Sequence, residues 1–423
     1  MSLERRRPGT GNPLRSQGRR VTAQGRVPRV PTPAERIGQF LRRTREGQNL
    51  SQEQLAALTD GRPGRVSRAT ISAVECGRHL PGLEVLLTLS QVLHISPNEV
   101  LERLELARVA SVDAAELSLD ELESRASESF WAGDHRHAVA CYDAMLRKLE
   151  QDEAGDPRET TMRIARTELR RGTALRRCGA TIAARGAVER AISLADGVPQ
   201  IQAEAYVVLV ALLDKLGCGP LARDAAERAV ELADQSDDPR VKGWARIEKG
   251  VVLMSCGRYD EARLAYVQAR QWVRKANDKR HEIHVEGNIA GCLKELGRRQ
   301  QARKRYLKAV VLSRRYGVPS LEAVWFVELG CLALDEGELD GAEAYALAAL
   351  KIARPAEHLL TCFRAEWLRH RVQLRSKPED PDRHRVAYLR RLYARLEDHR
   401  GIPEIQEFKT AYCKPPSNRG GTS

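Results

Sequence analysis

The 423-residue sequence predicts an all-α protein, in which a small N-terminal domain of five helices is followed by a long array of stacked helical hairpins. Two observations lead to this fold class. Between residues 32 and 106, Ser and Thr stand as N-caps directly ahead of apolar residues at helical spacing. From residue 119 onward, glycines and small residues recur with a period close to 40, which is typical of repeated helical hairpins.

Each of the five N-terminal helices has its own start signal. Residues 32–35 (TPAE) supply an N-cap, a first-turn proline and an acid that completes a capping box. Residues 51–54 (SQEQ) form a second capping box, which satisfies free backbone N–H groups. Ser67 is the expected N-cap of the third helix, leucines at residues 83–93 predict a fourth, and residues 96–104 a fifth.

The predicted third helix, from Arg68 to Glu75, has two different faces. Thr70, Ile71 and Val74 fall at helical spacing and are expected to pack inward. The residues left on the outward face are Arg68, Ala69, Ser72 and Ala73.

The segments LSQEQLA at residues 50–56 and TISAVECGRHLP at residues 70–81 carry a specific pattern. They resemble the lambda-repressor-like (XRE) helix-turn-helix family, whose pattern is L-S-Q-x-x-L-A, a turn, and T-I-S-x-x-E-x-G-x-x-x-P. The resemblance implies a DNA-binding domain over residues 33–106, with an internal ion pair between Arg45 and Glu75. The base-reading positions that it implies are Arg68, Ala69 and Ala73, to which the outward face adds Ser72, and the phosphate-contacting positions are Gln52, Ser67 and Arg78.

Arg68 is the strongest candidate for base recognition, because a guanidinium can bond guanine O6 and N7 together, whereas alanine reaches only a thymine methyl group. An ordinary solvated arginine is the alternative. One departure from the family pattern lies in the turn, where GRPGR at residues 61–65 adds about five residues. The insertion is expected to alter the crossing of the two helices and to provide Arg62 and Arg65 as further phosphate contacts.

The net charge of +13 is unevenly distributed. Residues 1–33 hold eight arginines against one acid, and their low apolar content predicts that residues 1–32 form a disordered basic tail. Such a tail either follows DNA phosphates and adds salt-dependent affinity, or serves only as a solubilising leader. Residues 414–423 are also expected to be disordered.

The composition, 42% hydrophobic and 30% charged, is that of a globular protein. The longest apolar run, residues 205–213, is too short for a membrane helix, and no signal-peptide pattern follows the basic N-terminus, so a cytoplasmic protein without membrane contact is expected. Nine scattered cysteines without a C-x-x-C pair, and histidines without metal-ligand spacing, predict neither a disulfide framework nor a metal site. The sequence contains no catalytic motif or cofactor-binding loop, which argues against an enzyme.

The repeat array is expected to occupy residues 119–413, after a linker at residues 107–118. Its turn glycines are separated by 46, 38, 40, 40 and 40 residues, and each is followed five positions later by alanine. Six repeats are therefore predicted, followed by a seventh hairpin over residues 357–399 and a closing helix over residues 402–412. The turn glycines are Gly133, Gly179, Gly217, Gly257, Gly297 and Gly337.

The repeats resemble tetratricopeptide (TPR) repeats but exceed the usual length by about six residues, which implies longer helices or longer loops. In such superhelices the first helix of each repeat lines a concave groove. A side-chain amide such as that of Asn288 can donate and accept hydrogen bonds at once, which suits a peptide backbone. The alternative is a solvated face on a scaffold that binds a protein elsewhere. The predicted groove residues are Arg166, Arg170, Thr173, Arg177, Trp244, Glu248, His284, Asn288 and Glu328.

A helix-turn-helix domain joined to a TPR array resembles the bacterial peptide-pheromone receptors called RRNPP regulators, which take part in quorum sensing. The resemblance implies a homodimeric transcription regulator that binds double-stranded DNA. A peptide or similar ligand in the groove would change the spacing of the two DNA-binding domains. The alternative is a DNA-binding protein whose array is a docking or oligomerisation scaffold for a protein partner, without a small ligand.

Overall fold

The computed structural model describes residues 32–61, 64–107, 117–151, 156–377, 382–396 and 402–413. The chain is all-α, with no strand in these ranges. Four predicted features lie wholly or mainly outside the described residues: the basic tail before Thr32, most of the linker, the phosphate contact at Arg62, and the tail at residues 414–423.

The N-terminal domain (residues 32–107) contains the five expected helices. The capping boxes that begin at Thr32 and Ser51 are both formed, and the Ser67 hydroxyl accepts the backbone N–H of Thr70. The fifth helix extends three residues beyond its predicted end. The helices are α1 (Pro33–Gly47), α2 (Gln52–Leu58), α3 (Arg68–Glu75), α4 (Leu83–Val92) and α5 (Pro97–Ala107).

Inward faces of the helices of the N-terminal domain build its core. Gly38 allows α1 to contact α3 directly, since a Cβ atom there would lie 2.2 Å from the carbonyl oxygen of Val74. Leu58 and Leu83 are 50% and 67% exposed because they lie at helix ends beyond the core. The buried apolar residues are Ile37, Leu41, Leu55, Val66, Ile71, Val74, Leu86, Leu89, Val92, Leu93, Ile95 and Val100.

Thr59 closes the long turn between α2 and α3. Its side chain is fully buried, and its hydroxyl donates to the carbonyl oxygen of Ala56 (2.7 Å) and accepts the backbone N–H of Val66 (3.0 Å). These hydrogen bonds hold the two ends of the inserted turn together. Helix α2 therefore still packs on α3.

The repeat array (residues 117–413) consists of fifteen helices among the described residues. The first six, which form repeats one to three, are α6 (Leu119–Trp131), α7 (His135–Gln151), α8 (Pro157–Arg177), α9 (Thr181–Leu194), α10 (Pro199–Lys215) and α11 (Gly219–Gln235). Repeats four to six are α12 (Pro239–Ser255), α13 (Tyr259–Lys275), α14 (Lys279–Glu295), α15 (Arg299–Arg315), α16 (Pro319–Asp335) and α17 (Leu339–Ala353). The last three helices are α18 (Leu359–Ser376), α19 (Arg383–Arg395) and α20 (Pro403–Tyr412).

Longer helices, rather than longer loops, account for the length of the repeats. Helices α10 to α16 are each 17 residues long. Connections of three residues between them complete the 40-residue period. The six turn glycines have φ between 73° and 86°, a backbone region that glycine adopts without strain.

Small residues lie where the two helices of a repeat come closest. The alanine five positions after each turn glycine is fully buried in all six repeats. A Cβ atom on Gly172 would lie 2.6 Å from Val188, and one on Gly250 would lie 2.5 Å from Tyr266. Each pair joins the position seven residues before a turn to the position nine residues after it, which explains the spacing in the sequence.

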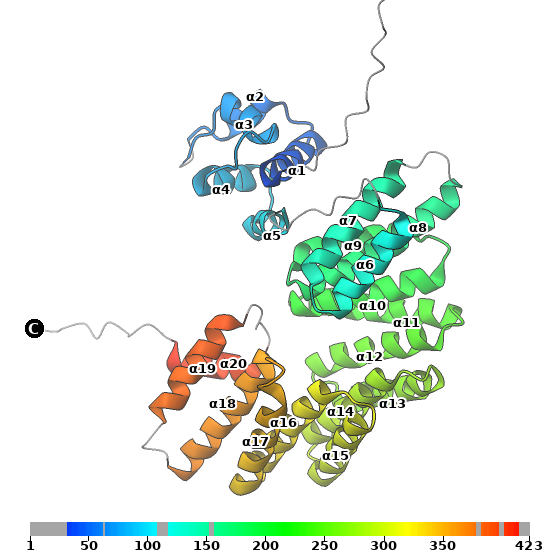
Figure 1. Ribbon diagram of the computed structural model, residues 1–423, viewed down its shortest axis with the longest axis vertical. Helices are drawn as coiled ribbons and strands as arrows, with labels where there is room; N and C mark the ends of the chain where they lie inside the picture. Colours follow the sequence, from blue (N-terminus) through cyan, green and yellow to red (C-terminus); the bar gives the residue numbers. More distant parts are fainter. Residues whose placement is uncertain are drawn as a thin grey trace, which may run out of the picture.

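Figure 1 shows the repeats stacked into a curved array, with the N-terminal domain beside the first repeats. The two parts touch where α5 packs on α9. At the other end α20 packs on α18, and Phe408 is buried against Phe363 and Trp367. Among the helices described, none combines the length and the apolar character that a bilayer crossing requires.

Candidate DNA interface and ligand groove

The outward face of α3 is open to solvent. Arg68 and Ala69 are exposed, and Ser72 and Ala73 are half-buried. Thr70, which was expected to pack inward, is also half-buried. Because the other side of α3 packs on α1, these outward residues are the ones that can meet a DNA groove.

Arg68 is held by a weak contact only. Its side chain is 65% exposed and pairs with Glu53 of α2, with 2.6 Å between Nη1 and Oε1. An exposed ion pair contributes about 0–1 kcal/mol. A guanine that offers O6 and N7 together can therefore replace Glu53 at little cost.

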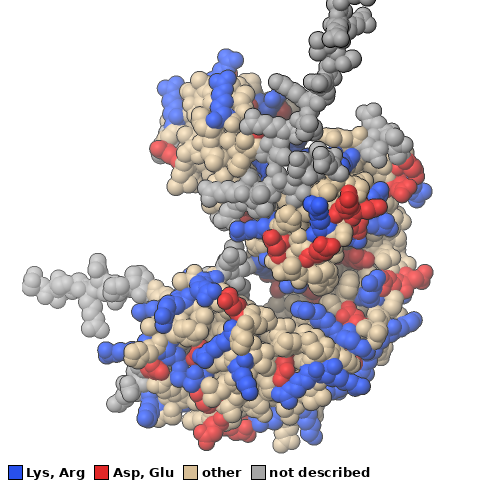
Figure 2. Space-filling model, in the orientation of Figure 1, with Lys and Arg blue, Asp and Glu red and all other residues tan. Residues whose placement is uncertain are grey.

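The candidate phosphate contacts differ in how available they are. Arg78 is exposed, and so is Arg65, which pairs with Asp60 at 2.7 Å. The Ser67 hydroxyl already accepts the backbone N–H of Thr70 as the cap of α3. In the view of Figure 2, the N-terminal domain carries more basic than acidic side chains, as a surface that attracts phosphates requires.

The half-buried Gln52, also a predicted phosphate contact, makes a hydrogen bond within the domain. Arg45 and Glu75 form a bidentate ion pair with distances of 2.6 and 2.9 Å, and their side chains are only 8% and 3% exposed. The Gln52 amide donates to the same carboxylate at 2.7 Å. Since a buried carboxylate is stabilised by each additional donor, this contact explains why Gln52 turns inward.

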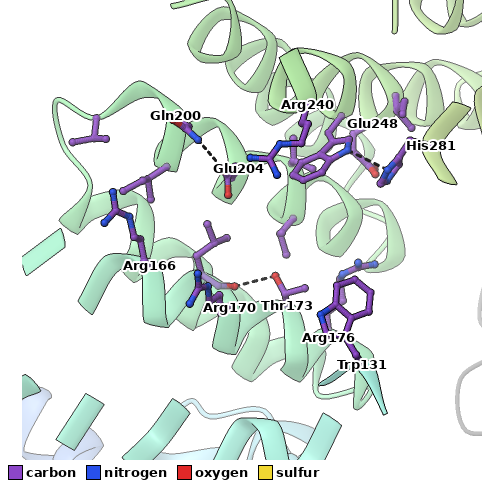
Figure 3. Close-up of a pocket in the computed structure, with 17 residues that line it drawn as sticks. Trp131, Arg166, Arg170, Thr173, Arg176, Gln200, Glu204, Arg240, Glu248 and His281 are labelled. Atoms are coloured by element: carbon purple, nitrogen blue, oxygen red, sulfur yellow. Dashed lines mark hydrogen bonds between the residues drawn. The ribbon is translucent and has the colours of Figure 1, made fainter. Parts of the chain in front are cut away.

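A first cavity of about 640 Å³ runs along the first helices of repeats one to five. Figure 3 shows the side chains of α8 on one wall and those of Glu204 (α10), Glu248 (α12) and His281 (α14) on the other. Trp131 of α6 is 79% exposed and lines the same cavity. The apolar part of the lining consists of Leu169, Val198, Ile201, Val207, Val208 and Ile247.

Some of the predicted groove residues line this first cavity and others do not. Arg177 does not line it, because the cavity lies on the side of α8 that faces α10 and α12, and Arg176 occupies that side. Arg177 is exposed beyond it. The predicted residues that do line it are Arg166, Arg170, Thr173, Trp244 and Glu248, and those that the sequence missed are Trp131, Arg176, Gln200, Glu204, Arg240 and His281.

The charges in the first cavity are only partly neutralised. Glu248 is half-buried and has no hydrogen-bond partner among the described residues, and its burial raises its pKa to about 7 although Arg176 and His281 act in the opposite direction. Burial also raises the pKa of Glu204. Arg166 and Arg176 have no ion-pair partner within the described ranges. Cationic groups on one wall thus face the carboxyl groups of Glu204 and Glu248, whose pKa values burial raises.

A second cavity of about 340 Å³ follows between α12, α14 and α16. Asn288 lines it, half-buried and without a hydrogen-bond partner in the described part of the chain. Glu328 also lines it, but Arg364 of α18 binds this carboxylate at 2.6 Å and binds Glu404 of α20 at the same distance. Arg364 therefore joins helices α16, α18 and α20 through Glu328 and Glu404, while Glu328 also faces the second cavity.

His284 belongs to a row of aromatic side chains that connects the two cavities. Its ring lies 6.1 Å from that of His281 and 6.2 Å from that of Trp325, which is itself 6.1 Å from Tyr306. Trp244 continues the row on the other side, 5.5 Å from His281. Burial, followed by the charges of His281 and nearby arginines, lowers the pKa of His284 to about 4, so this ring is neutral at physiological pH.

Residues 41–100 match the helix-turn-helix family. Among solved structures, the chain is similar to aspartyl phosphate phosphatase F from Bacillus subtilis, with 12% identity, a TM-score of 0.51, and coverage of 86% of this chain and 94% of that one. It is also similar to PlcR of Bacillus thuringiensis in complex with the peptide PapR7 and DNA (13% identity, TM-score 0.40, 69% and 99% covered). A third similar structure is the apo form of the competence regulator ComR from Streptococcus vestibularis (13%, 0.38, 71% and 99%).

No curated protein matches the sequence. The similarity at a TM-score of 0.51 supports the fold of the array and nothing finer. Taken with the geometry of α1 to α5, the match over residues 41–100 identifies the N-terminal domain as a helix-turn-helix DNA-binding domain, followed here by a TPR-like helical array.

Proposed function

We propose that this protein is a sequence-specific transcription regulator in which the array binds a peptide and thereby alters how two copies hold DNA. Arg68, Ala69, Ser72 and Ala73 are the proposed base-reading residues. The ligand lies along both cavities and the aromatic row between them. The protein acts as a cytoplasmic homodimer, without catalysis.

One observation supports the ligand most directly: the first cavity contains some charged side chains that have no ion-pair partner among the described residues. Desolvating a charge is costly unless it is paired, so the half-buried Arg176 and Glu248 are better satisfied with a ligand than without one, and the exposed Arg166 is free to meet it. A peptide offers carboxylates, amines and backbone amides together. Its backbone suits Asn288 in the second cavity, and its apolar side chains suit the aromatic row.

Selection of bound fragments from random duplexes tests the DNA-binding half of the proposal. The purified full-length chain should enrich one motif, and a dimer should enrich it as two half-sites separated by about one helical turn or a multiple of it. Substitution Arg68→Ala should then weaken binding to that motif by about 1–3 kcal/mol and relax discrimination at one base pair.

Arg78→Ala is the matched control, because Arg78 is exposed on the same domain but lies beyond α3. It should weaken binding to all duplexes alike and lower the salt dependence. If Arg68→Ala behaves in this same uniform way, Arg68 contacts phosphate and not a base.

Thermal unfolding in the presence of peptide pools tests the ligand. Pools of hexapeptides to decapeptides, with free or amidated C-termini, should raise the melting temperature of the wild-type chain if one of them binds the folded state. The same pools should leave a variant with both Arg166→Ala and Glu248→Ala unshifted. A shift that survives in this variant would place the binding outside the first cavity.

The scaffold function has one observation in its favour. Second helices of four repeats carry apolar side chains on the surface, which a protein partner or a second copy could cover. Analytical ultracentrifugation of a variant with polar replacements at these positions distinguishes a second copy from a different protein partner. If the variant no longer dimerises, these positions form the self-association surface. The residues, between 41% and 60% exposed, are Leu221, Leu264, Leu307, Val311 and Leu347.

A further inference from the structure

A carboxylate takes part in the contact between α5 of the N-terminal domain and α9 of the array. Glu102 of α5 accepts the backbone N–H groups of Ile182 (3.1 Å) and Ala183 (3.2 Å) in the first turn of α9. Free N–H groups at a helix start usually find a side chain from their own chain segment. Here the cap comes from a residue some eighty positions earlier in the sequence, in another domain.

The chain offers an internal comparison for this cap. Ala180, the N-cap residue of α9, has no side-chain oxygen. In the first repeat the matching position, directly after the turn glycine, is Asp134, whose carboxylate accepts the backbone N–H of His137 at 3.0 Å. In repeats three to six the residue at this position supplies no side-chain cap either, so the second repeat differs from them in having its second helix capped by the N-terminal domain.

Helix α8 connects this contact to the groove. One face of α8 presents Arg166, Arg170 and Arg176 to the first cavity. The opposite face presents Glu168 and Arg171 to a third cavity of about 430 Å³, which α5 and α9 also line beside Glu102. A displacement of α8 by a ligand therefore acts on the helix pair to which the DNA-binding domain is attached.

We propose that Glu102 is a positioning residue: by capping α9 it fixes the orientation of the DNA-binding domain on the array, and so sets the distance between two DNA half-sites. The part of this inference that concerns half-sites rests on the proposed function. The part that concerns the orientation of the domain does not.

Three full-length variants separate positioning from simple helix capping. Glu102→Ala removes the interdomain cap. Glu102→Ala combined with Ala180→Asp removes it but restores a local cap of the kind that Asp134 provides in the first repeat. Glu99→Ala is the control: Glu99 lies on the same helix and lines the same third cavity, but its ion pair is with Arg103 of its own helix and not with α9.

Hydrogen exchange measures the capping of α9, and small-angle X-ray scattering measures the orientation of the DNA-binding domain. Neither experiment needs DNA. In Glu102→Ala, exchange of the amides of Ile182 and Ala183 should become about fivefold faster, the factor that corresponds to a helix cap of about 1 kcal/mol. The scattering curve should change, because the domain is no longer held in one orientation. Adding Ala180→Asp should restore slow exchange but not the wild-type scattering, and Glu99→Ala should match the wild type in both.

Binding to duplexes with two selected half-sites at varied spacing gives the functional measurement. The wild-type preference for one spacing should fall at least about fivefold in Glu102→Ala and remain low after Ala180→Asp. The proposal is wrong if Ala180→Asp restores spacing preference and scattering together with exchange, or if Glu99→Ala reproduces the effects of Glu102→Ala. If the wild type selects no duplex, the proposed function fails, and exchange and scattering still decide the role of Glu102.

Discussion

The two halves of the groove use charge in opposite ways. In the first cavity Arg166, Arg176 and Glu248 have no ion-pair partner among the described residues. Around the second cavity Glu328 and Glu404 share Arg364, at 2.6 Å each. The comparison indicates that charges near the C-terminal end hold the array together, whereas those near the N-terminal end remain available to a ligand.

Arg364→Met should give the largest effect on stability. It leaves Glu328 and Glu404 close together, half-buried and without their shared cation, so the free energy of unfolding should fall by about 3 kcal/mol. Chemical denaturation followed by circular dichroism measures this loss. Arg166→Ala, made in parallel, should stay within about 0.5 kcal/mol of the wild type. Equal losses in the two variants would remove the distinction between the two halves.

Arg166→Ala and Arg176→Ala should instead show their effect in binding. Each removes a donor for an anionic group of the ligand, and a hydrogen bond to a charged group contributes about 1.5–3 kcal/mol. Isothermal titration with a stabilising peptide should therefore show affinity losses of about 2 kcal/mol. Arg177→Ala is the control on the same helix, since Arg177 lies outside the first cavity. An equal loss in that control would extend the binding site beyond α8's cavity-lining face.

Gly287 and Gly291 test the aromatic row from the same helix. A Cβ atom on Gly287 would lie 2.3 Å from the ring of Trp325, so Gly287→Ala should displace that ring and destabilise the array by about 1–2 kcal/mol. A Cβ atom on Gly291 would lie 3.6 Å from its nearest neighbour, the Tyr306 hydroxyl oxygen, which is an ordinary contact. Gly291→Ala should therefore stabilise the helix by about 0.5–1 kcal/mol. Thermal unfolding and tryptophan fluorescence measure both; a neutral Gly287→Ala would show that Trp325 is not fixed.

Glu248 and Glu328 should respond to pH with opposite signs. Burial raises the pKa of Glu248 to about 7, so the folded state loses stability as the pH rises from about 4.5 to 7, and Glu248→Gln should gain about 1 kcal/mol at pH 8 but nothing at pH 4.5.

Burial would also raise the pKa of Glu328, but Arg364 and Lys294 outweigh it and lower this pKa. Its ionised form therefore contributes stability that is present above the unfolded pKa and lost as the pH falls through the lowered folded value. Glu328→Gln should destabilise the array by about 1 kcal/mol at pH 8. Melting temperatures of both variants at pH 4.5 and pH 8 test these opposite effects. A gain in stability from Glu328→Gln at pH 8 would contradict the pairing of Glu328 with Arg364.

The fold could be predicted because its signals are local. Thr32 and Ser51 define helix starts through their own neighbours, and each turn glycine is fixed by a positive φ at one position. The closure of the inserted turn could not be predicted, because the Thr59 hydroxyl reaches Val66 across seven residues of irregular chain.

The groove was harder to predict, because its residues depend on the curvature of the stack. Helical periodicity placed Arg166, Arg170 and Thr173 correctly on one stripe, but it chose Arg177 over Arg176, and only the packing of α10 and α12 decides between these neighbours. Gln52 and Glu102 illustrate the same limit. Each has a partner far away in sequence, so nothing in its immediate surroundings indicates that the side chain is engaged.

The regular 40-residue spacing of Gly257, Gly297 and Gly337 makes the array modular. A segment between equivalent positions of neighbouring turns contains one complete hairpin. Removing or duplicating this segment joins two equivalent turn positions. Lengthening or shortening the chain in such steps offers an engineering route to arrays whose length changes by one hairpin at a time.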